Sequence, residues 1–299
     1  MKRIRVLALI LCACFVSVAW GQQPPCKRPG SWGEFHRTNM QRWNPCETVL
    51  NVKTVRNLQL KWKDSIGTFV NSSPAVVDGV VYVSIGNIYE LFALNAATGA
   101  TLWTYVPCCA YTAAAVANGV VYVGSDVGIW ALNASTGTLL WSYAAGVDGS
   151  SAPAVANGVV YVGSGDSNVY ALKASTGALL WSYATGNAVN SSPAVANGIV
   201  YVGSDDNSVY ALNASTGAKL WSYTTYGAVT SSPAVANGVV YAQSGDHFYA
   251  LNAKTGAKLW SYYPNHTGSA GYPSPAVANG MLYFYGGGGG RNLYAFGLQ

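Results

Sequence analysis

The amino-acid sequence predicts an all-β protein with the architecture of a six-bladed β-propeller, in which each blade is a four-stranded antiparallel sheet. Three observations support this prediction. A unit of about forty residues recurs along the chain, which is the period of a propeller blade. Each unit contains four short runs rich in Val, Tyr, Leu and Trp, and residues that favour turns separate these runs. No stretch has the periodicity of an amphipathic helix.

The period can be read from six equivalent positions. They are separated by 40, 39, 40, 40 and 42 residues and are Pro74, Ala114, Pro153, Pro193, Pro233 and Pro275. Residues 192–224 show the unit most clearly, as SPAVANG, IVYVGSDDN, SVYALNASTG and AKLWSYT. Runs such as 199–202 are apolar on both faces, as expected where sheets cover one another. The chain is 51% apolar and only 9% charged, so it can fill such a core.

The two ends of the repeat region predict a closed ring. The last unit stops after its third strand, at residues 292–296, and lacks a fourth strand with tryptophan. Residues 58–63, LQLKWK, match a fourth strand that has no first three strands before it. We expect residues 58–63 to pair with residues 292–296, because this would complete the sixth blade and remove an exposed strand edge.

One tryptophan recurs in each unit. We expect these residues to pack between neighbouring blades rather than to bind a ligand, and they are Trp62, Trp103, Trp141, Trp181, Trp221 and Trp260.

The N-terminus predicts export. The basic start MKRIR precedes a 15-residue apolar run, which is too short to span a bilayer and is typical of a secretory signal. Residues 1–21 are the expected signal, with cleavage before Gln22, and lipidation at Cys14 is the alternative. Residues 22–57 are then an N-terminal cap segment and 58–299 the propeller. The expected location is periplasmic or extracellular, with no transmembrane segment after cleavage.

Charge and cysteine content limit the function further. Loss of Lys2, Arg3 and Arg5 with the signal leaves 16 minus 3, that is 13, basic residues against 11 acidic ones, so nothing favours nucleic acid binding. Four cysteines remain in the exported chain, and they allow three pairings. The expected pairing joins neighbours in sequence, Cys26 with Cys46 and Cys108 with Cys109.

Residues 211–221 read ALNASTGAKLW and resemble the tryptophan-docking motif A-x-D-x-x-T-G-x-x-x-W of the PQQ-like (pyrroloquinoline quinone) β-propellers, the quinoprotein alcohol dehydrogenase-like superfamily. The motif recurs at 93–103, 131–141, 171–181 and 250–260, usually with Asn in place of Asp, so the resemblance covers nearly all of 58–299. It implies the propeller fold. The superfamily includes quinone-dependent dehydrogenases and non-catalytic propellers similar to the lipoprotein of the outer-membrane assembly machinery, so the resemblance leaves the activity open.

The adjacent pair Cys108 and Cys109 lies in a linker between two blades. The dehydrogenases of this superfamily carry a similar pair against the quinone, so the resemblance implies that these two residues would contact PQQ if it binds. The alternative is a rigid linker. A quinone also needs calcium held by carboxylate and amide oxygens. The available carboxylates, Asp126, Asp166, Asp205, Asp206 and Asp246, all lie in turns where Asp commonly bonds its own backbone, so no metal site is expected. His247 is interpreted as a surface histidine.

These observations favour a non-catalytic, monomeric, exported propeller that binds a protein or carbohydrate partner. The expected binding face comprises inter-blade loop residues, namely Cys108, Cys109, Tyr111, Asp148, Asn190, Tyr226 and His266. The alternative is a dehydrogenase dependent on PQQ and calcium that oxidises an alcohol or a sugar.

Overall fold

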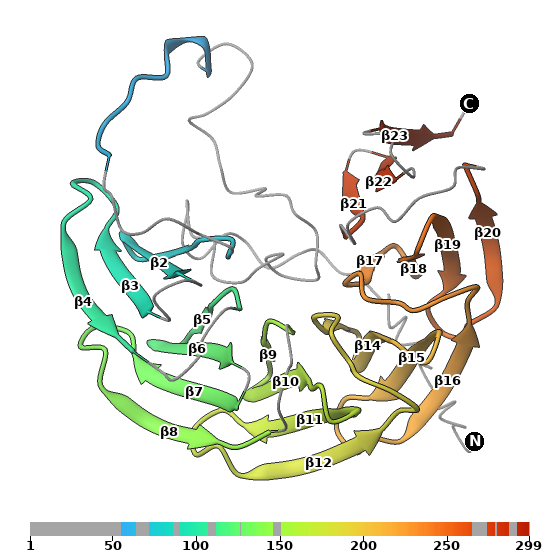
Figure 1. Ribbon diagram of the computed structural model, residues 1–299, viewed down its shortest axis with the longest axis horizontal. Helices are drawn as coiled ribbons and strands as arrows, with labels where there is room; N and C mark the ends of the chain where they lie inside the picture. Colours follow the sequence, from blue (N-terminus) through green and yellow to red (C-terminus); the bar gives the residue numbers. More distant parts are fainter. Residues whose placement is uncertain are drawn as a thin grey trace, which may run out of the picture.

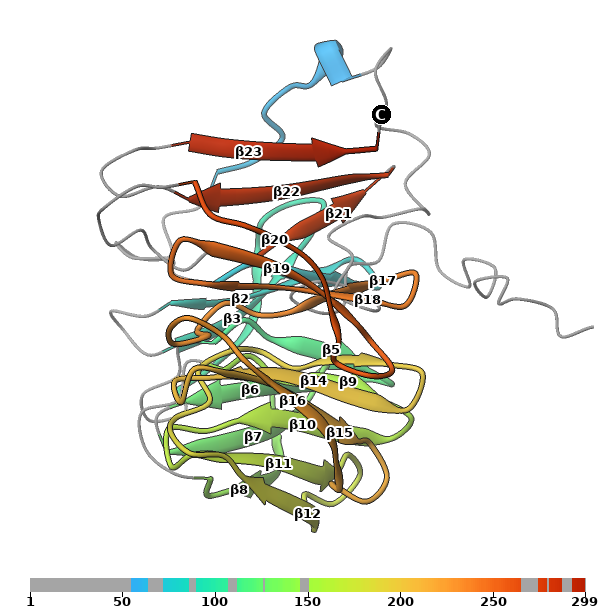
Figure 2. The ribbon, with the colours of Figure 1, turned by 90° about the vertical axis from the view of Figure 1, so that its right-hand side faces the viewer.

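The structure, a computed structural model, describes residues 55–63, 72–85, 90–106, 112–125, 127–145, 151–264, 274–278, 280–286 and 292–298. These residues form six antiparallel sheets, preceded by the short 3-10 helix η2 (Val55–Asn57). The sheets are arranged like propeller blades, with their first strands towards the centre and their fourth strands on the outer rim (Figure 1). Seen from the side, the strands run from one face of the disc to the other (Figure 2). No helix in these ranges is long and apolar enough to cross a membrane.

In the described ranges, five sheets have four strands and the sixth has three, and within each sheet neighbouring strands are consecutive in the chain. The first comprises β1 (Ala75–Val77), β2 (Val80–Ile85), β3 (Glu90–Asn95) and β4 (Thr101–Tyr105). The second comprises β5 (Ala115–Ala117), β6 (Val120–Ser125), β7 (Gly128–Asn133) and β8 (Leu139–Tyr143). The third comprises β9 (Ala154–Ala156), β10 (Val159–Gly163), β11 (Asn168–Lys173) and β12 (Leu179–Ala184).

The fourth sheet comprises β13 (Ala194–Ala196), β14 (Ile199–Ser204), β15 (Ser208–Asn213) and β16 (Lys219–Thr224). The fifth comprises β17 (Ala234–Ala236), β18 (Val239–Ser244), β19 (His247–Asn252) and β20 (Lys258–Tyr262). The sixth comprises β21 (Ala276–Ala278), β22 (Met281–Gly286) and β23 (Asn292–Gly297). The predicted all-β fold with six sheets is therefore confirmed, although the sixth sheet has one strand fewer than expected.

The turn between the third and fourth strands explains much of the repeated motif. In the fourth sheet, the Asn213 Oδ1 atom accepts hydrogen bonds from the backbone N–H groups of Ser215 and Thr216, at 2.9 and 3.1 Å. The Gly217 N–H donates to the Asn213 carbonyl at 2.8 Å, and Gly217 has a φ of +72°. Asn therefore closes the turn with its side chain, and Gly supplies a left-handed conformation that other residues adopt at a cost.

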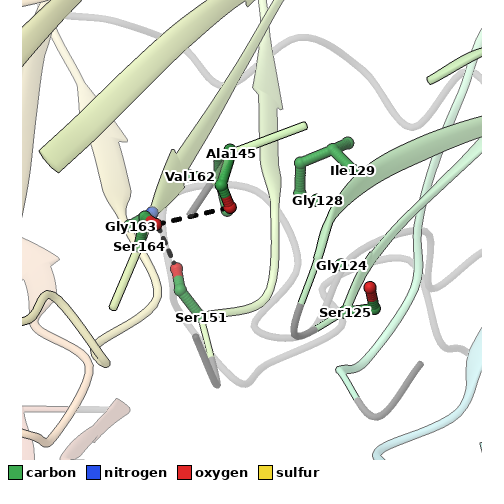
Figure 3. Close-up of a pocket in the computed structure, with 9 residues that line it drawn as sticks. All are labelled: Gly124, Ser125, Gly128, Ile129, Ala145, Ser151, Val162, Gly163 and Ser164. Carbon is green, nitrogen blue, oxygen red and sulfur yellow. Dashed lines mark hydrogen bonds between the residues drawn. The ribbon is translucent and has the colours of Figure 1, made fainter. Parts of the chain in front are cut away.

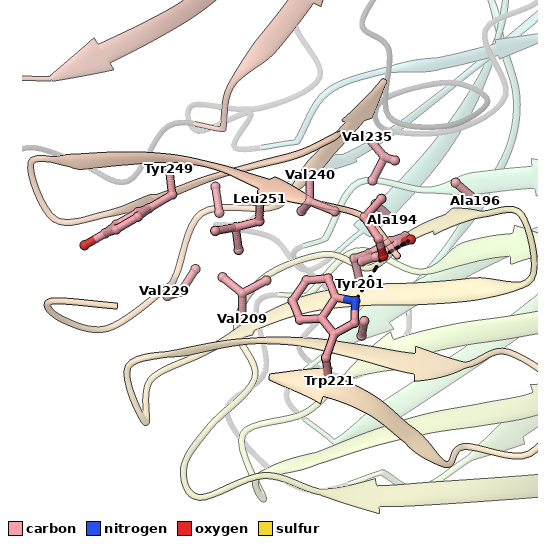
Figure 4. Close-up of a cluster of buried hydrophobic side chains, with 13 residues drawn as sticks. Ala194, Ala196, Tyr201, Val209, Trp221, Val229, Val235, Val240, Tyr249 and Leu251 are labelled. Atoms are coloured by element: carbon pink, nitrogen blue, oxygen red, sulfur yellow. Dashed lines mark hydrogen bonds between the residues drawn. The ribbon is translucent and has the colours of Figure 1, made fainter. Parts of the chain in front are cut away.

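Neighbouring sheets are joined by a tyrosine and a tryptophan that share one acceptor. The Trp181 Nε1–H donates to the Ala214 carbonyl of the next sheet at 2.9 Å, and the Tyr161 hydroxyl donates to the same oxygen at 3.1 Å. Trp221 and Tyr201 repeat this arrangement between the fourth and fifth sheets, where they lie in a buried apolar cluster (Figure 4). Each of these inter-sheet contacts combines apolar burial with satisfied polar groups.

Hydroxyl groups next to the first strands connect the sheets near the centre. The Ala152 N–H donates to the Ser192 Oγ atom at 2.9 Å, and the Ser192 N–H donates to the Ser232 Oγ atom at the same distance. The Ser232 N–H donates to the Ser274 Oγ atom at 3.1 Å. The third to sixth sheets are thus linked in series by side-chain oxygens, and we call this series the serine relay.

The predicted closure of the ring is not observed. Residues 58–63 form no strand, and the sixth sheet ends at β23. Figure 1 shows this segment and β23 at the two ends of the arc of sheets. Trp62 instead docks on the first sheet, where its Nε1–H donates to the Ala96 carbonyl at 2.9 Å and its ring packs against an apolar cluster. Trp62 is the anchor of the segment, because Leu58 and Leu60 on the same segment are 62% and 82% exposed.

Candidate functional site

One face of the disc carries the side chains that depart most from simple packing. It is formed by the linkers between sheets and by the turns between second and third strands. These segments are hydrogen-bonded to one another: the Thr225 N–H of a linker donates to the Asn207 carbonyl at 2.7 Å, and the Gly227 N–H donates to the Ser244 Oγ atom at 2.9 Å. The linkers are therefore held against the turns of two successive sheets. We call this surface the linker face.

Aspartates in the turns of the linker face accept several hydrogen bonds each. The Tyr210 hydroxyl and the Gly186 N–H both donate to the Asp206 Oδ2 atom, at 2.6 and 2.7 Å. Burial, followed by the hydrogen bond to Asp206 and its charge, raises the pKa of Tyr210 to about 12. Asp206 therefore ties a turn to the preceding linker, and Tyr210 remains a neutral donor at physiological pH.

Asp205 and Asp166 occupy similar turns but have opposite pKa shifts. Burial raises the pKa of Asp205, and the charge of Asp206 adds to this, while a hydrogen bond from Asn190 at 2.9 Å opposes it. Burial also acts to raise the pKa of Asp166, but hydrogen bonds from Tyr170, Ser164 and Asn168 together outweigh burial and lower it. The difference follows from the number of donors that each carboxylate receives.

These shifts predict opposite effects on stability. The raised pKa of Asp205 means that its contribution is fully present below the unfolded value of 3.8 and is lost as pH rises through the folded pKa. The lowered pKa of Asp166 means that its contribution is present above 3.8 and is lost as pH falls through the folded pKa. At pH 7, Asp205→Asn is expected to raise the thermal midpoint and Asp166→Asn to lower it.

Melting curves of both variants and the parent chain between pH 3 and pH 7 would check this prediction. The difference for Asp205→Asn should shrink as the pH falls through the raised pKa of Asp205, and the difference for Asp166→Asn should begin to shrink only below pH 3.8. If both substitutions shifted the thermal midpoint in the same direction at pH 7, the opposite pKa shifts assigned to Asp205 and Asp166 would be contradicted.

Three aromatic rings stack on the linker face beside the fifth sheet. The His247 ring lies between the rings of Tyr226 and Tyr263, with centroid distances of 4.6 and 4.3 Å and interplanar angles of 23° and 10°. Tyr226 is 81% exposed and Tyr263 is 45% exposed. Burial lowers the pKa of His247 and the nearby charge of Asp246 acts against this, so the ring is neutral at pH 7. We call these three residues the aromatic stack.

A small pocket lies between the second and third sheets (Figure 3). Ser151 and Ser164 reach into its wall, where Ser151 accepts a hydrogen bond from the Gly163 N–H at 2.9 Å. The space open to the centre of a water molecule is about 10 Å³, which is room for roughly one water. This pocket cannot hold a ring-sized ligand.

The structure places only some of the residues predicted for the binding face. Asn190 and Tyr226 lie on the linker face, Asn190 bonded to Asp205 and Tyr226 in the aromatic stack. Outside the described residues lie Cys14, Cys26, Cys46, Cys108, Cys109, Tyr111, Asp126, Asp148 and His266. The two predicted cysteine pairings, the signal and most of the cap segment therefore stay predictions.

Sequence reasoning missed two members of the stack. His247 was interpreted as a surface histidine, whereas the structure places its ring between two tyrosines, and Tyr263 was not singled out. The repeat pattern could have identified all three residues. Tyr226, His247 and Tyr263 stand where the preceding unit has Gly186, Ser208 and Thr224.

The described carboxylates do not form a calcium site. Asp166, Asp206 and Asp246 lie in the turns of three different sheets, and only Asp205 and Asp206 are neighbours. Among the residues that the structure describes, no three His, Cys, Asp or Glu side chains gather closely enough to hold a metal ion. The donor set seen in these ranges therefore does not fit a calcium-bound quinone.

Comparison with known proteins places the chain in a family. The family model described as outer membrane protein assembly factor BamB matches residues 93–192 and 165–296. The dehydrogenase subunit of alcohol dehydrogenase (quinone) from Komagataeibacter europaeus is 36% identical over 112 residues, which cover 32% of this chain and 15% of that relative. The quinoprotein alcohol dehydrogenase PedE from Pseudomonas putida is 39% identical over 102 residues and is matched over 16% of its length. The chain thus spans a small part of these curated relatives.

Solved structures show the same fold. Quinohemoprotein alcohol dehydrogenase ADHIIG from Pseudomonas putida HK5 superposes with a TM-score of 0.67 and 24% identity, covering 80% of this chain and 48% of that one. BamB from Moraxella catarrhalis superposes with a TM-score of 0.50 and 22% identity, covering 73% of this chain and 80% of that one. With the family match over most of the repeat region, the chain belongs to the family of outer membrane protein assembly factor BamB, among the PQQ-like β-propellers of the quinoprotein alcohol dehydrogenase-like superfamily.

Proposed function

We propose that this protein is an exported, non-catalytic β-propeller that serves as a binding or scaffold module for a protein or carbohydrate partner. The observation that carries the proposal is the linker face, which presents an exposed aromatic stack while its turn carboxylates bond within the fold. Asp166 and Asp206 each accept a tyrosine hydroxyl at 2.6 Å, and Asp205 accepts the Asn190 amide. These groups shape a surface, and the described part of the chain offers no general base aimed at an open cavity.

The wider organisation is part of the same proposal. The basic and apolar N-terminus supports export with cleavage after residue 21, followed by a cap segment over 22–57 and the propeller over 58–299. We propose a monomer, stabilised by disulfides between Cys26 and Cys46 and between Cys108 and Cys109. The family match supports a protein partner, because the family is described as an outer-membrane protein assembly factor.

A second candidate is a dehydrogenase dependent on PQQ and calcium. The curated relatives favour it, since those named here are quinone-dependent alcohol dehydrogenases that match 29 to 32% of this chain. If the quinone binds, Cys108 and Cys109 are the residues proposed to contact it. The carboxylates of the described turns argue against it, because those of the third, fourth and fifth sheets lie in separate turns.

Addition of the quinone separates the two candidates. The purified full-length mature protein is mixed with calcium and micromolar PQQ, and the quinone absorption and the reduction of a dye by ethanol or glucose are recorded. We expect neither a shifted absorption nor dye reduction. Dye reduction that disappears when Cys108 and Cys109 are both replaced by Ser would overturn the non-catalytic assignment.

A further inference from the structure

The aromatic stack is built from departures from the repeat. Tyr226 stands in the linker after β16, His247 is the first residue of β19, and Tyr263 follows β20. The preceding unit has Gly186, Ser208 and Thr224 at these positions, and its sheet has the same four strands in the same order. The blade therefore does not need the three rings in order to fold. The three residues that differ from the repeat are far apart in the sequence, but their rings meet at one point of the linker face.

Hydrogen bonds hold the stack in place. The Tyr226 N–H donates to the Tyr249 hydroxyl at 3.1 Å, and the next residue, Gly227, donates to the Ser244 Oγ atom at 2.9 Å. The linker is thus fixed to the fifth sheet on both sides of the Tyr226 α-carbon. One face of the Tyr226 ring covers His247, and because the side chain is 81% exposed, the other face is open to solvent. A ring presented in this way can stack a further planar group without reorganising.

Charge is divided between the two faces of the disc. Within the described part of the propeller, residues 72–298, the linker face carries Asp166, Asp205, Asp206 and Asp246 in its turns and Glu90 at the start of β3, and the remaining acidic residue, Asp78, stands in the β1–β2 turn on the opposite face. The lysines of the same ranges, Lys173, Lys219, Lys254 and Lys258, all stand at or beside the turns between third and fourth strands, on the opposite face. The carboxylates around the stack therefore have no lysine or arginine near them in the described ranges.

The negative charge near the stack is also poorly compensated within the protein. The Oδ1 atoms of Asp205, Asp206 and Asp246 are buried and accept no hydrogen bond in the described structure. Tyr226 lies between the turn that carries Asp205 and Asp206 and the turn that carries Asp246, because Thr225 is bonded to Asn207 on one side and Gly227 to Ser244 on the other. A cation over the Tyr226 ring need not touch these oxygens, since the interaction of unit charges extends over several ångströms near a protein surface.

We propose that the aromatic stack is a docking site for an arginine side chain carried by a basic segment of a protein partner. The planar guanidinium would stack on the open face of Tyr226, and the surrounding carboxylates would attract its charge. A neutral sugar would also stack on the ring, but it would not be attracted by the negative charge of the linker face. The inference rests on the proposed binding role and names the chemistry of the partner.

The test uses the full-length mature protein and a fluorescent peptide in which three arginines alternate with glycine and serine. A second peptide carries citrulline at the same places, which preserves the shape and removes the charge. Binding is measured by fluorescence anisotropy at pH 7.5 in 50 and 200 mM salt. We expect the arginine peptide to bind more tightly than the citrulline peptide, and to bind more weakly at the higher salt concentration.

Variants taken from the repeat itself locate the site. Tyr226→Gly, His247→Ser and Tyr263→Thr introduce the residues of the preceding unit, so the fold is expected to persist. Tyr226→Gly should weaken binding of the arginine peptide about five-fold, the effect of one exposed cation–π contact. Leu220→Ala, at a side chain 48% exposed on β16, is the control and should leave binding unchanged.

The pH dependence provides a second readout. His247 contacts Tyr226, Tyr249 and Tyr263 and lies near Asp246. Protonation of His247 would place a positive charge behind Tyr226, so binding should weaken between pH 7.5 and pH 5, and His247→Ser should reduce that dependence. Equal binding of the parent and Tyr226→Gly would overturn the proposal, as would binding of a neutral oligosaccharide in place of the arginine peptide. Reduction of the dye in the presence of PQQ would instead contradict the proposed non-catalytic role. Failure of the arginine site and failure of the proposed function therefore give different results.

Discussion

Replacing Trp181 with alanine is expected to lower the free energy of unfolding by roughly 3–5 kcal/mol. The side chain is only 8% exposed and packs in the apolar cluster between the third and fourth sheets. The substitution leaves a cavity between two sheets and removes the donor to the Ala214 carbonyl, at 2.9 Å in the structure. The effect should be seen as a lower midpoint in urea unfolding followed by circular dichroism.

Leu180 provides the control for this substitution. It is the neighbouring residue of β12, but its side chain is 50% exposed and does not belong to the apolar cluster around Trp181. Leu180→Ala should change the free energy of unfolding by no more than about 0.5 kcal/mol, as is usual for surface sites. If Trp181→Ala unfolded at the same urea concentration as Leu180→Ala, the tryptophan would not be a docking residue.

Gly217→Ala is expected to have the second large effect. Gly217 has a φ of +72°, and a Cβ atom there would lie 2.7 Å from the Cδ2 atom of Trp181. The left-handed conformation alone costs about 1–2 kcal/mol for a residue with a Cβ atom. Displacement of the tryptophan should add a further 1–3 kcal/mol, the usual cost of overpacking. The glycine of one unit thus receives the tryptophan of the unit before it.

Gly198 separates the two contributions. Its φ is +74°, nearly that of Gly217, but a Cβ atom there would have nothing within 4 Å. Gly198→Ala therefore reports the backbone cost alone, and the difference between the two variants in urea unfolding measures displacement of Trp181. Equal losses of stability would show that the turn, and not the docked ring, requires glycine at position 217.

The repeat predicted the sheets because the residues that form them act locally. Pairs such as Asn157 and Gly158 adopt φ values of 51° and 76°, which suit a tight turn, and similar pairs recur in most units. The order of strands within each sheet followed directly from these turns. Closure of the ring was predicted from residues 58–63 alone, without a repeated neighbour to support their register, and the structure shows Trp62 docked on the first sheet with no strand formed.

The candidate site was only partly predictable for a different reason. Tyr226 was expected on the binding face because it departs from the repeat in a linker. His247 was considered as a single residue, and its role depends on two rings that lie 21 positions before it and 16 positions after it in the chain. Stacking of that kind is a property of the folded molecule. A comparison of all departures from the repeat at equivalent register would have found all three rings.

The serine relay has a mechanical consequence. It joins the third sheet to the sixth through serine Oγ atoms that accept hydrogen bonds. In the second and third units the equivalent positions are Ala113 and Ala152, whose methyl groups cannot accept a hydrogen bond. Near the centre of the disc, hydrogen bonds thus connect the third to sixth sheets in series, whereas the first three sheets are held together there by apolar packing. Under heat or an applied force, parting of the blades should begin between the first three, and the amide protons of Ser73 and Ala113 should exchange with solvent before those of Ser192 and Ser232.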